Sequence, residues 1–119
     1  MAWANPIQVQ EVLINLLTNA RDAVEGQPGA SVHVQGWRVD DEYCAFAVED
    51  NGPGLSPEYR DQIFVPFVTT KPSEQGTGLG LFTSRRMVSE LGGDLFYEDR
   101  PGGGARFVVQ LPFLKETGS

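Results

Sequence analysis

The first part of the chain alternates apolar and polar residues with the period of an amphipathic α-helix, over residues 6–25. Asn5 can cap the start of this helix, Pro6 suits its first position, and Gly26 follows its end. One side of the predicted helix is apolar. The adjacent polar face spans an arc of about 80° and carries Gln8, Glu11, Asn15, Asn19 and Asp22. Asparagine is a poor helix former, so its presence twice on this face needs an explanation.

The rest of the chain combines two pairs of strand-like runs with helical and irregular segments. Period-two alternation indicates the strands, and the turn sequences DDE and DRPGGG join the members of each pair. The predicted elements are strands over residues 31–39 and 43–49, a short helix over 57–64, an irregular connection over 65–80, a helix over 77–91, and strands over 94–98 and 105–111. This order is typical of an α+β fold, a two-layer sandwich with helices on one face of a mixed, mostly antiparallel sheet. The irregular connection is long enough to be a lid.

Length and composition fit a single domain over residues 1–119, with a frayed tail at 114–119. The formal net charge is −7 and Lys plus Arg number 9, which argues against a nucleic-acid surface. No apolar run reaches the roughly 18 residues that a membrane span needs, so we expect a soluble domain without membrane contact. The one cysteine, Cys44, cannot form an internal disulfide and is expected to be a small buried hydrophobe.

The two asparagines of the first helix are one helical turn apart. Asn15 and Asn19 can therefore direct both amide oxygens to the same point. Neutral oxygen ligands of this kind suit Mg2+ that already carries phosphates and waters, since the ion takes few protein ligands. The alternative is an ordinary polar helix face in which the asparagines have no special role.

The motif EDNGPG, residues 49–54, ends a predicted strand. Asp50 follows a hydrophobic run, and a carboxylate there can accept a hydrogen bond from an exocyclic amine such as that of adenine. Gly52 and Gly54 permit close backbone approach and positive φ angles. An ordinary strand-to-helix turn explains the same residues equally well.

The motif GTGLGL, residues 76–81, opens the second long helix. Unpaired amides at a helix N-terminus, with glycines that let a phosphate come close, form an anion site. The motif is neither G-x-G-x-x-G nor a P-loop, so by itself it is a weak signal.

The motif IFVPFVTTK, residues 63–71, begins the irregular connection. Phe64 and Phe67 can anchor the base of a lid, and Lys71 can reach a phosphate. The alternative is a pair of core phenylalanines followed by a solvated lysine.

Taken together and in this order, the four motifs resemble the catalytic ATP-binding domain of sensor histidine kinases. That domain has the Bergerat fold shared with gyrase, the mismatch-repair ATPase and a heat-shock chaperone. EVLINLLTNARDA is similar to its N box, DNGPG to its G1 box, IFVPFVTTK to its F box and GTGLGL to its G2 box. The similarity covers residues 6–112. PFVTTK, the short lid and GGGARFVVQLP are most similar to the nitrogen-regulatory and dicarboxylate-sensing branch.

This resemblance implies roles for individual residues. Asn19 would ligate Mg2+, Asn15 would assist at the metal and phosphates, and Asp50 would hydrogen-bond the adenine of ATP. With Lys71, the two asparagines form the catalytic set. The positions implied to bind the nucleotide are Asn15, Asn19, Asp22, Asp50, Gly52, Gly54, Phe67, Thr70, Lys71, Gly76, Thr77, Gly78, Leu79 and Gly80.

Two positions depart from the family pattern. Many members have Lys where this chain has Asp22, which puts a direct phosphate contact at this position in question; Lys71 or Arg85 could substitute for it. The hydrolytic members have Glu where this chain has Asn15, and an amide cannot serve as a general base for water. This favours phosphoryl transfer to a protein side chain over rapid ATP hydrolysis.

The resemblance also implies that the acceptor histidine is elsewhere. His33 is the only histidine and lies in a strand-like run, SVHVQGW, where we expect a structural or surface role. In the family the acceptor lies on a preceding dimeric helical hairpin and passes the phosphate to a response regulator. We therefore expect this chain to be a cytoplasmic fragment that begins just before the N box, whether or not the parent kinase is membrane-anchored.

Two other functions remain open on the sequence. The chain could be a stand-alone Bergerat-fold serine kinase of the anti-sigma type, whose acceptor is a separate protein. It could instead be a degenerate domain that binds nucleotide weakly and serves as an interaction module. Intact Asn19, Asp50 and G2 glycines argue against degeneracy.

Overall fold

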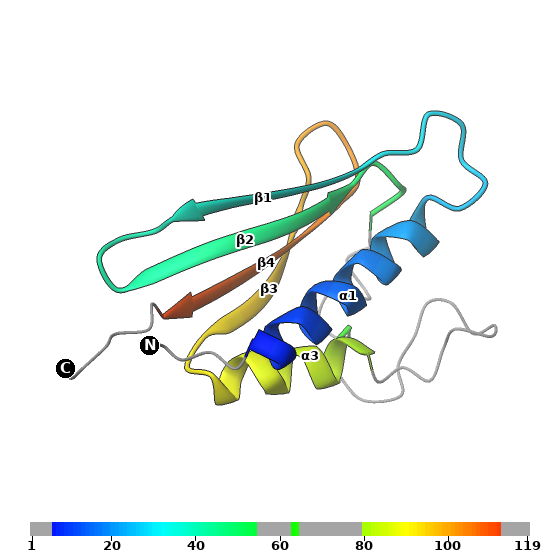
Figure 1. The fold of residues 1–119 in the computed structure, drawn as a ribbon. Helices are drawn as coiled ribbons and strands as arrows, with labels where there is room; N and C mark the ends of the chain where they lie inside the picture. The colour runs from blue at the N-terminus through cyan, green and yellow to red at the C-terminus, as the bar shows by residue number, and fades with distance from the viewer. Residues whose placement is uncertain (1–5, 55–62, 65–79, 113–119) are drawn as a thin grey trace.

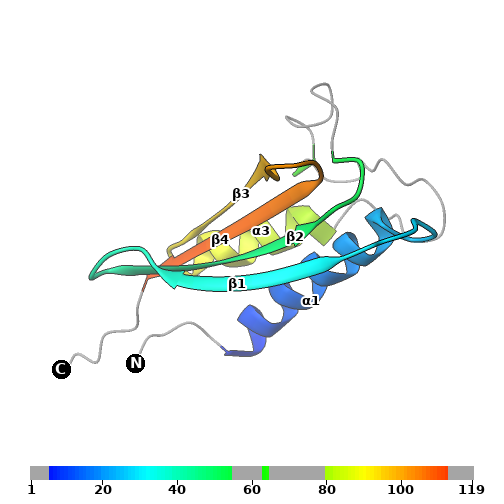
Figure 2. The same ribbon diagram turned by 90° about the horizontal axis from the view of Figure 1, so that it is seen from above.

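The computed structural model describes residues 6–54, 63–64 and 80–112. Its elements are α1 (Pro6–Ala23), β1 (Val32–Arg38), β2 (Tyr43–Asp50), α3 (Gly80–Glu90), β3 (Asp94–Asp99) and β4 (Ala105–Pro112). Both helices lie on one face of the sheet (Figures 1 and 2). The predicted α+β fold is confirmed. The short helix predicted over 57–64 lies outside the described residues except for Ile63 and Phe64, which form a turn.

The described strands form one sheet in the order β1-β2-β4-β3, and every neighbouring pair is antiparallel. Strands β2 and β4 are therefore central, with β1 and β3 at the edges. β1 is exposed along its whole length, whereas β4 is largely buried. Because β2 has a neighbour on each side, its last residue, Asp50, is held between β1 and β4.

The core lies between the sheet and the two helices. Its fully buried side chains include Leu16 of α1, Val88 of α3 and Leu95 of β3. Phe107, Val109 and Leu111 alternate along β4 and all face this core, as their spacing predicts. Cys44, Phe46 and Val48 on β2 also pack there, with Cys44 and Phe46 partly buried.

The outer face of the sheet, away from the helices, carries a smaller apolar cluster. Ala45 and Ala47 of β2 and Val108 of β4 are buried there, with Phe96 packed against them. The alternating residues Cys44, Phe46 and Val48 therefore account for the inner face of β2 only. On the outer face, Ala45 and Ala47 pack beside Val108 and Phe96. Both faces of β2 therefore carry apolar side chains, although only one faces the helices.

The end of β2, the C-terminal end of α1 and the start of α3 lie at the same end of the molecule (Figures 1 and 2). A Cβ atom at Gly52, just after β2, would come within 2.9 Å of the carbonyl oxygen of Ala23, the last residue of α1. The fold therefore gathers three of the sequence motifs at one end. Neither α1 nor α3, the helices of the described part, is long and apolar enough to cross a membrane.

Candidate functional site

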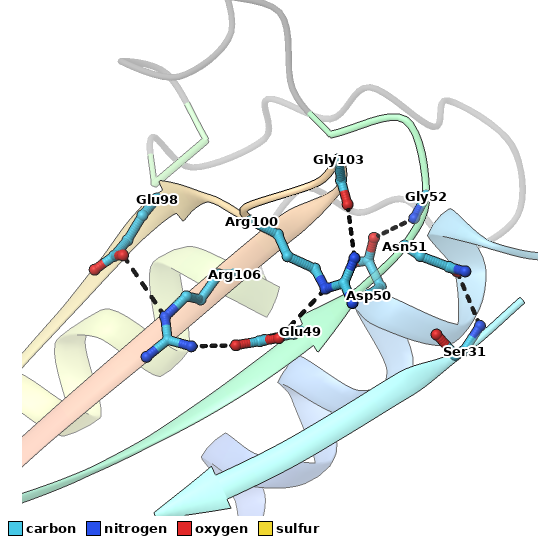
Figure 3. Close-up of polar contacts among 9 residues, drawn as sticks. All are labelled: Ser31, Glu49, Asp50, Asn51, Gly52, Glu98, Arg100, Gly103 and Arg106. Carbon is cyan, nitrogen blue, oxygen red and sulfur yellow. Dashed lines mark hydrogen bonds and ion pairs between the residues drawn. The ribbon is translucent and has the colours of Figure 1, made fainter.

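The Asp50 carboxylate is the most deeply buried charge in the described part of the chain, with 2% of the residue exposed. Its Oδ1 accepts a hydrogen bond of 2.9 Å from the backbone nitrogen of Gly52 (Figure 3). No other described residue bonds to the carboxylate. Buried polar atoms normally have partners, and among the described residues the second oxygen has none, which makes it a candidate acceptor for a donor on a ligand.

The two glycines after Asp50 are required first by the protein's own packing. A Cβ atom at Gly52 would lie 3.0 Å from Oδ1 of Asp50, in addition to its approach to α1. Gly54 has a φ of +74°, and its Cβ would lie 3.2 Å from the carbonyl oxygen of Gly104. Both glycines are closely approached, by backbone atoms of α1 at Gly52 and of the β3–β4 turn at Gly54, but only Gly54 has the positive φ expected of the pair.

Asn51 ties the end of β2 to the loop between α1 and β1. Its Oδ1 accepts a hydrogen bond of 2.9 Å from the backbone nitrogen of Ser31 (Figure 3). Its Nδ2 donates to the carbonyl of Gly29 at 2.8 Å, and Gln27 Nε2 donates to the carbonyl of Asn51 at 2.9 Å. Sequence alone indicates only an ordinary turn at Asn51, because these partners are 20 to 24 residues away.

Asn15 meets α3 through one side-chain hydrogen bond. Its Nδ2 donates to Oγ of Ser84 at 3.0 Å, and Ser84 is 0% exposed. This contact holds the amide so that its nitrogen points to α3, and the amide oxygen is the group that remains to bind a cation. Asn19 lies one turn further along α1 and is half-buried. The sequence analysis did not assign Ser84, because its partner is 69 residues away.

The charged residues around the site have protein partners. The Asp22 carboxylate is largely buried, with Oδ1 3.6 Å from NH2 of Arg21. The Arg85 guanidinium lies over the ring of Phe64 at 4.5 Å and is 4.0 Å from Asp94. The guanidinium of Arg85, a residue of α3, therefore has two contacts within the protein.

Part of the predicted site lies outside the described residues. These positions are Phe67, Thr70, Lys71, Gly76, Thr77, Gly78 and Leu79. Gly80 is the first residue of α3, so that helix begins inside the glycine motif. Phe64 packs against the core, which fits a core phenylalanine as well as the base of a lid. His33 is exposed on β1, in agreement with a surface role.

The described residues suit a ligand that brings part of its own coordination shell. They contain no group of three or more His, Cys, Asp or Glu that could hold a metal ion. The amide oxygens of α1 are ligands that a hard cation accepts when phosphates and waters complete its shell. The buried carboxylate of Asp50 suits a hydrogen-bond donor.

The chain is similar to proteins of a known family. The family described as histidine kinase-, DNA gyrase B- and HSP90-like ATPases matches residues 4–115. The two-component sensor PprA of Pseudomonas aeruginosa is 46% identical over an alignment of 109 residues that covers 88% of this chain and 12% of PprA. The chain thus spans about an eighth of that relative's length.

Two solved structures share the fold. The catalytic domain of histidine kinase ThkA, solved without nucleotide, aligns with a TM-score of 0.79 and 32% identity, over 92% of this chain and 69% of that domain. Full-length ShkA, solved in complex with AMPPNP, aligns with a TM-score of 0.74 and 31% identity, over 92% of this chain and 22% of ShkA.

The Asn15–Ser84 contact leads to a prediction about stability. Ser84→Ala removes the acceptor and leaves the amide nitrogen without a partner in a half-buried place, so the free energy of unfolding should fall by about 1–2 kcal/mol. Urea denaturation measures it. Ser89→Ala, on the exposed side of the same helix, is the matched control and should change stability by less than about 0.5 kcal/mol. Equal losses in both variants would show that the contact contributes nothing.

Proposed function

Because the chain belongs to the family of histidine kinase-, DNA gyrase B- and HSP90-like ATPases, we propose that it binds ATP with Mg2+ and donates the γ-phosphoryl group to a histidine. That histidine would lie on a separate dimerisation domain of the same kinase and pass the phosphate to a response regulator. The observation that carries the proposal is the buried Asp50 carboxylate, whose Oδ1 is bonded to Gly52 while its other oxygen has no partner among the described residues.

At the adenine end, the chain provides an acceptor in a fixed position. The backbone nitrogen of Gly52 orients the Asp50 carboxylate, so the second oxygen can accept a hydrogen bond from the exocyclic amine of adenine. Burial strengthens such a bond, because the local dielectric is lower than that of water. Guanine has a carbonyl at the same place and would put two acceptors face to face. The site therefore favours ATP over GTP.

At the phosphate end, the chain provides amide oxygens. Asn19 and Asn15 would hold Mg2+ through their Oδ1 atoms, and Ser84 keeps the nitrogen of Asn15 turned away. When bound, the ion would neutralise phosphate charge during transfer. The remaining task of the protein is to bind and orient the γ-phosphate for attack. Lys71 is the proposed cation beside it, since Asp22 is acidic and Arg85 is engaged with Phe64.

The choice between hydrolysis and transfer depends on Asn15. An amide cannot take a proton from water at neutral pH, so nothing at this position activates water for attack on the phosphate. A nucleophile that brings its own basicity, such as a histidine side chain, does not need that assistance. Support comes from relatives that are sensor kinases and from ShkA, whose structure contains an ATP analogue. We place the domain in the cytoplasm, where ATP and response regulators are found.

Asp50→Asn tests the adenine contact. The variant keeps the acceptor for Gly52 but replaces the second oxygen with the NH2 group of an amide, a donor that would face the amino group of adenine. Affinity for a non-hydrolysable ATP analogue should fall by about tenfold or more, as expected from the loss of a charged hydrogen bond. Calorimetric titration measures it. Asp41→Asn, in the exposed turn before β2, should bind like the wild type. Unchanged affinity in folded Asp50→Asn would remove the adenine assignment.

Asn19→Ala tests the metal contact. If Asn19 is a ligand, the variant should lose most of the increase in ATP affinity that Mg2+ produces, with a smaller change in its absence. Titrations with and without Mg2+ give this ratio. Gln10→Ala, on the exposed side of α1, should keep it. A full Mg2+ effect in Asn19→Ala would show that the ion is held elsewhere.

The acceptor is tested by adding a histidine-bearing helical hairpin from a sensor kinase to the chain and γ-labelled ATP. The expected product is an acid-labile, alkali-stable phosphate on the hairpin, as phosphohistidine is. Acid-stable label on a serine of an added protein would favour the anti-sigma type instead. A folded chain that binds ATP and labels neither would be an interaction module.

A further inference from the structure

Glu49, the residue before Asp50, lies at the centre of an ion network on the outer face of the sheet. Neighbouring strand residues point to opposite faces, so Glu49 points away from the helices. Its Oε1 is 3.3 Å from Nε of Arg100, and its Oε2 pairs with NH1 of Arg106 (Figure 3). The Glu49 side chain is 14% exposed, so these ion pairs are better shielded from water than ordinary surface pairs.

Arg106 anchors this network to the sheet. It is the cross-strand neighbour of Glu49 on one side and of Glu98 on the other. Its Nε is 3.6 Å from Oε1 of Glu98, and its guanidinium lies over the ring of Trp37 at 5.2 Å. These contacts all join residues of regular strands. Arg106 therefore fixes the position of the Glu49 carboxylate.

Arg100 connects the same carboxylate to the β3–β4 turn, residues 100–104. Its NH1 donates to the carbonyl of Gly103 at 3.1 Å (Figure 3). Its backbone nitrogen donates to the carbonyl of Gly104 at 3.0 Å, and Gly103 nitrogen donates back to the carbonyl of Arg100 at 2.9 Å. The side chain and the backbone of Arg100 thus close the turn together.

The turn lies directly against the backbone of the adenine-binding residue. Gly104 has a φ of +118°, and a Cβ atom there would lie 1.9 Å from the carbonyl oxygen of Asp50. The carbonyl of Gly104 is also the close neighbour of Gly54. The turn therefore touches the polypeptide on both sides of Gly52, whose nitrogen orients the carboxylate. A displacement of the turn would remove one of the contacts that hold this segment.

From this arrangement we propose that Arg100 is a positioning residue for nucleotide binding. Through Glu49 and the glycine turn, it holds the backbone of Asp50 so that the free carboxylate oxygen faces adenine. The inference rests on the proposed function, because it concerns the same base contact. It extends the site to the outer face of the sheet, which no nucleotide group is expected to touch.

Arg100→Gln tests this role, because glutamine keeps the polar chain but loses the ion pair with Glu49. We expect the affinity for a non-hydrolysable ATP analogue to fall by about three- to tenfold. The affinity for the matching GTP analogue should not fall, because guanine has a carbonyl where adenine has its 6-amino group and makes no hydrogen bond to Asp50. Glu49→Gln should give the same pattern. Arg38→Gln, which removes an exposed ion pair with Asp41 near the opposite end of the sheet, is the matched control and should change neither affinity.

The outcomes separate positioning from general stability. A merely structural role would weaken both analogues equally, and that result would overturn the proposal. In an Asp50→Asn background, Arg100→Gln should produce no further loss, since the contact that it positions is already gone. If Asp50→Asn weakens ATP binding and Arg100→Gln does not, this inference alone fails. If Asp50→Asn binds ATP normally, the proposed adenine contact fails as well. Denaturation curves confirm that each variant is folded.

Discussion

The Asp50 carboxylate, 2% exposed at the end of the central strand β2, is the constraint on which the rest of the site depends. A buried charge is tolerated only where hydrogen bonds replace those made to water. One oxygen is bonded to Gly52, and that bond exists because the chain turns sharply after the strand. After the strand, the chain passes so close to Ala23 and Gly104 that side chains at Gly52 and Gly54 would not fit. The packing around the end of β2 therefore determines the orientation of the Asp50 carboxylate.

The two faces of the sheet contribute differently. The inner face and helices supply the core and the amides of α1, as in other two-layer α+β domains. The outer face joins two carboxylates, Glu49 and Glu98, to two guanidinium groups, Arg100 and Arg106. This cluster is neutral as a whole in a chain of net charge −7. The network fixes the positions of the strand ends and of the β3–β4 turn, because partly shielded ion pairs in a network are stronger than isolated surface pairs.

Sequence patterns predicted most of the fold. Helical and strand periods located α1, α3 and four strands, with ends within a few residues, because these patterns are local. For α1 the prediction ran two residues too far, since Val24 and Glu25 bond to carbonyls three residues back in a turn. The contacts of Asn51, Ser84 and Arg100 were not predictable, because each joins segments distant in sequence. The roles of the glycine motif and Lys71 toward phosphate stay predictions, since residues 65–79 lie outside the described part.

The hydrogen bond between Asn15 and Ser84 joins the two helices across 69 residues of sequence. Over evolutionary time, a change at position 84 to a side chain without an acceptor would leave the amide of Asn15 unsatisfied or free to turn over. If the amide turned over, its nitrogen would take the place of the oxygen that we propose as a ligand for Mg2+. Drift at a fully buried position on α3 is therefore limited by the chemistry required on α1, and the two positions are expected to change together when they change at all.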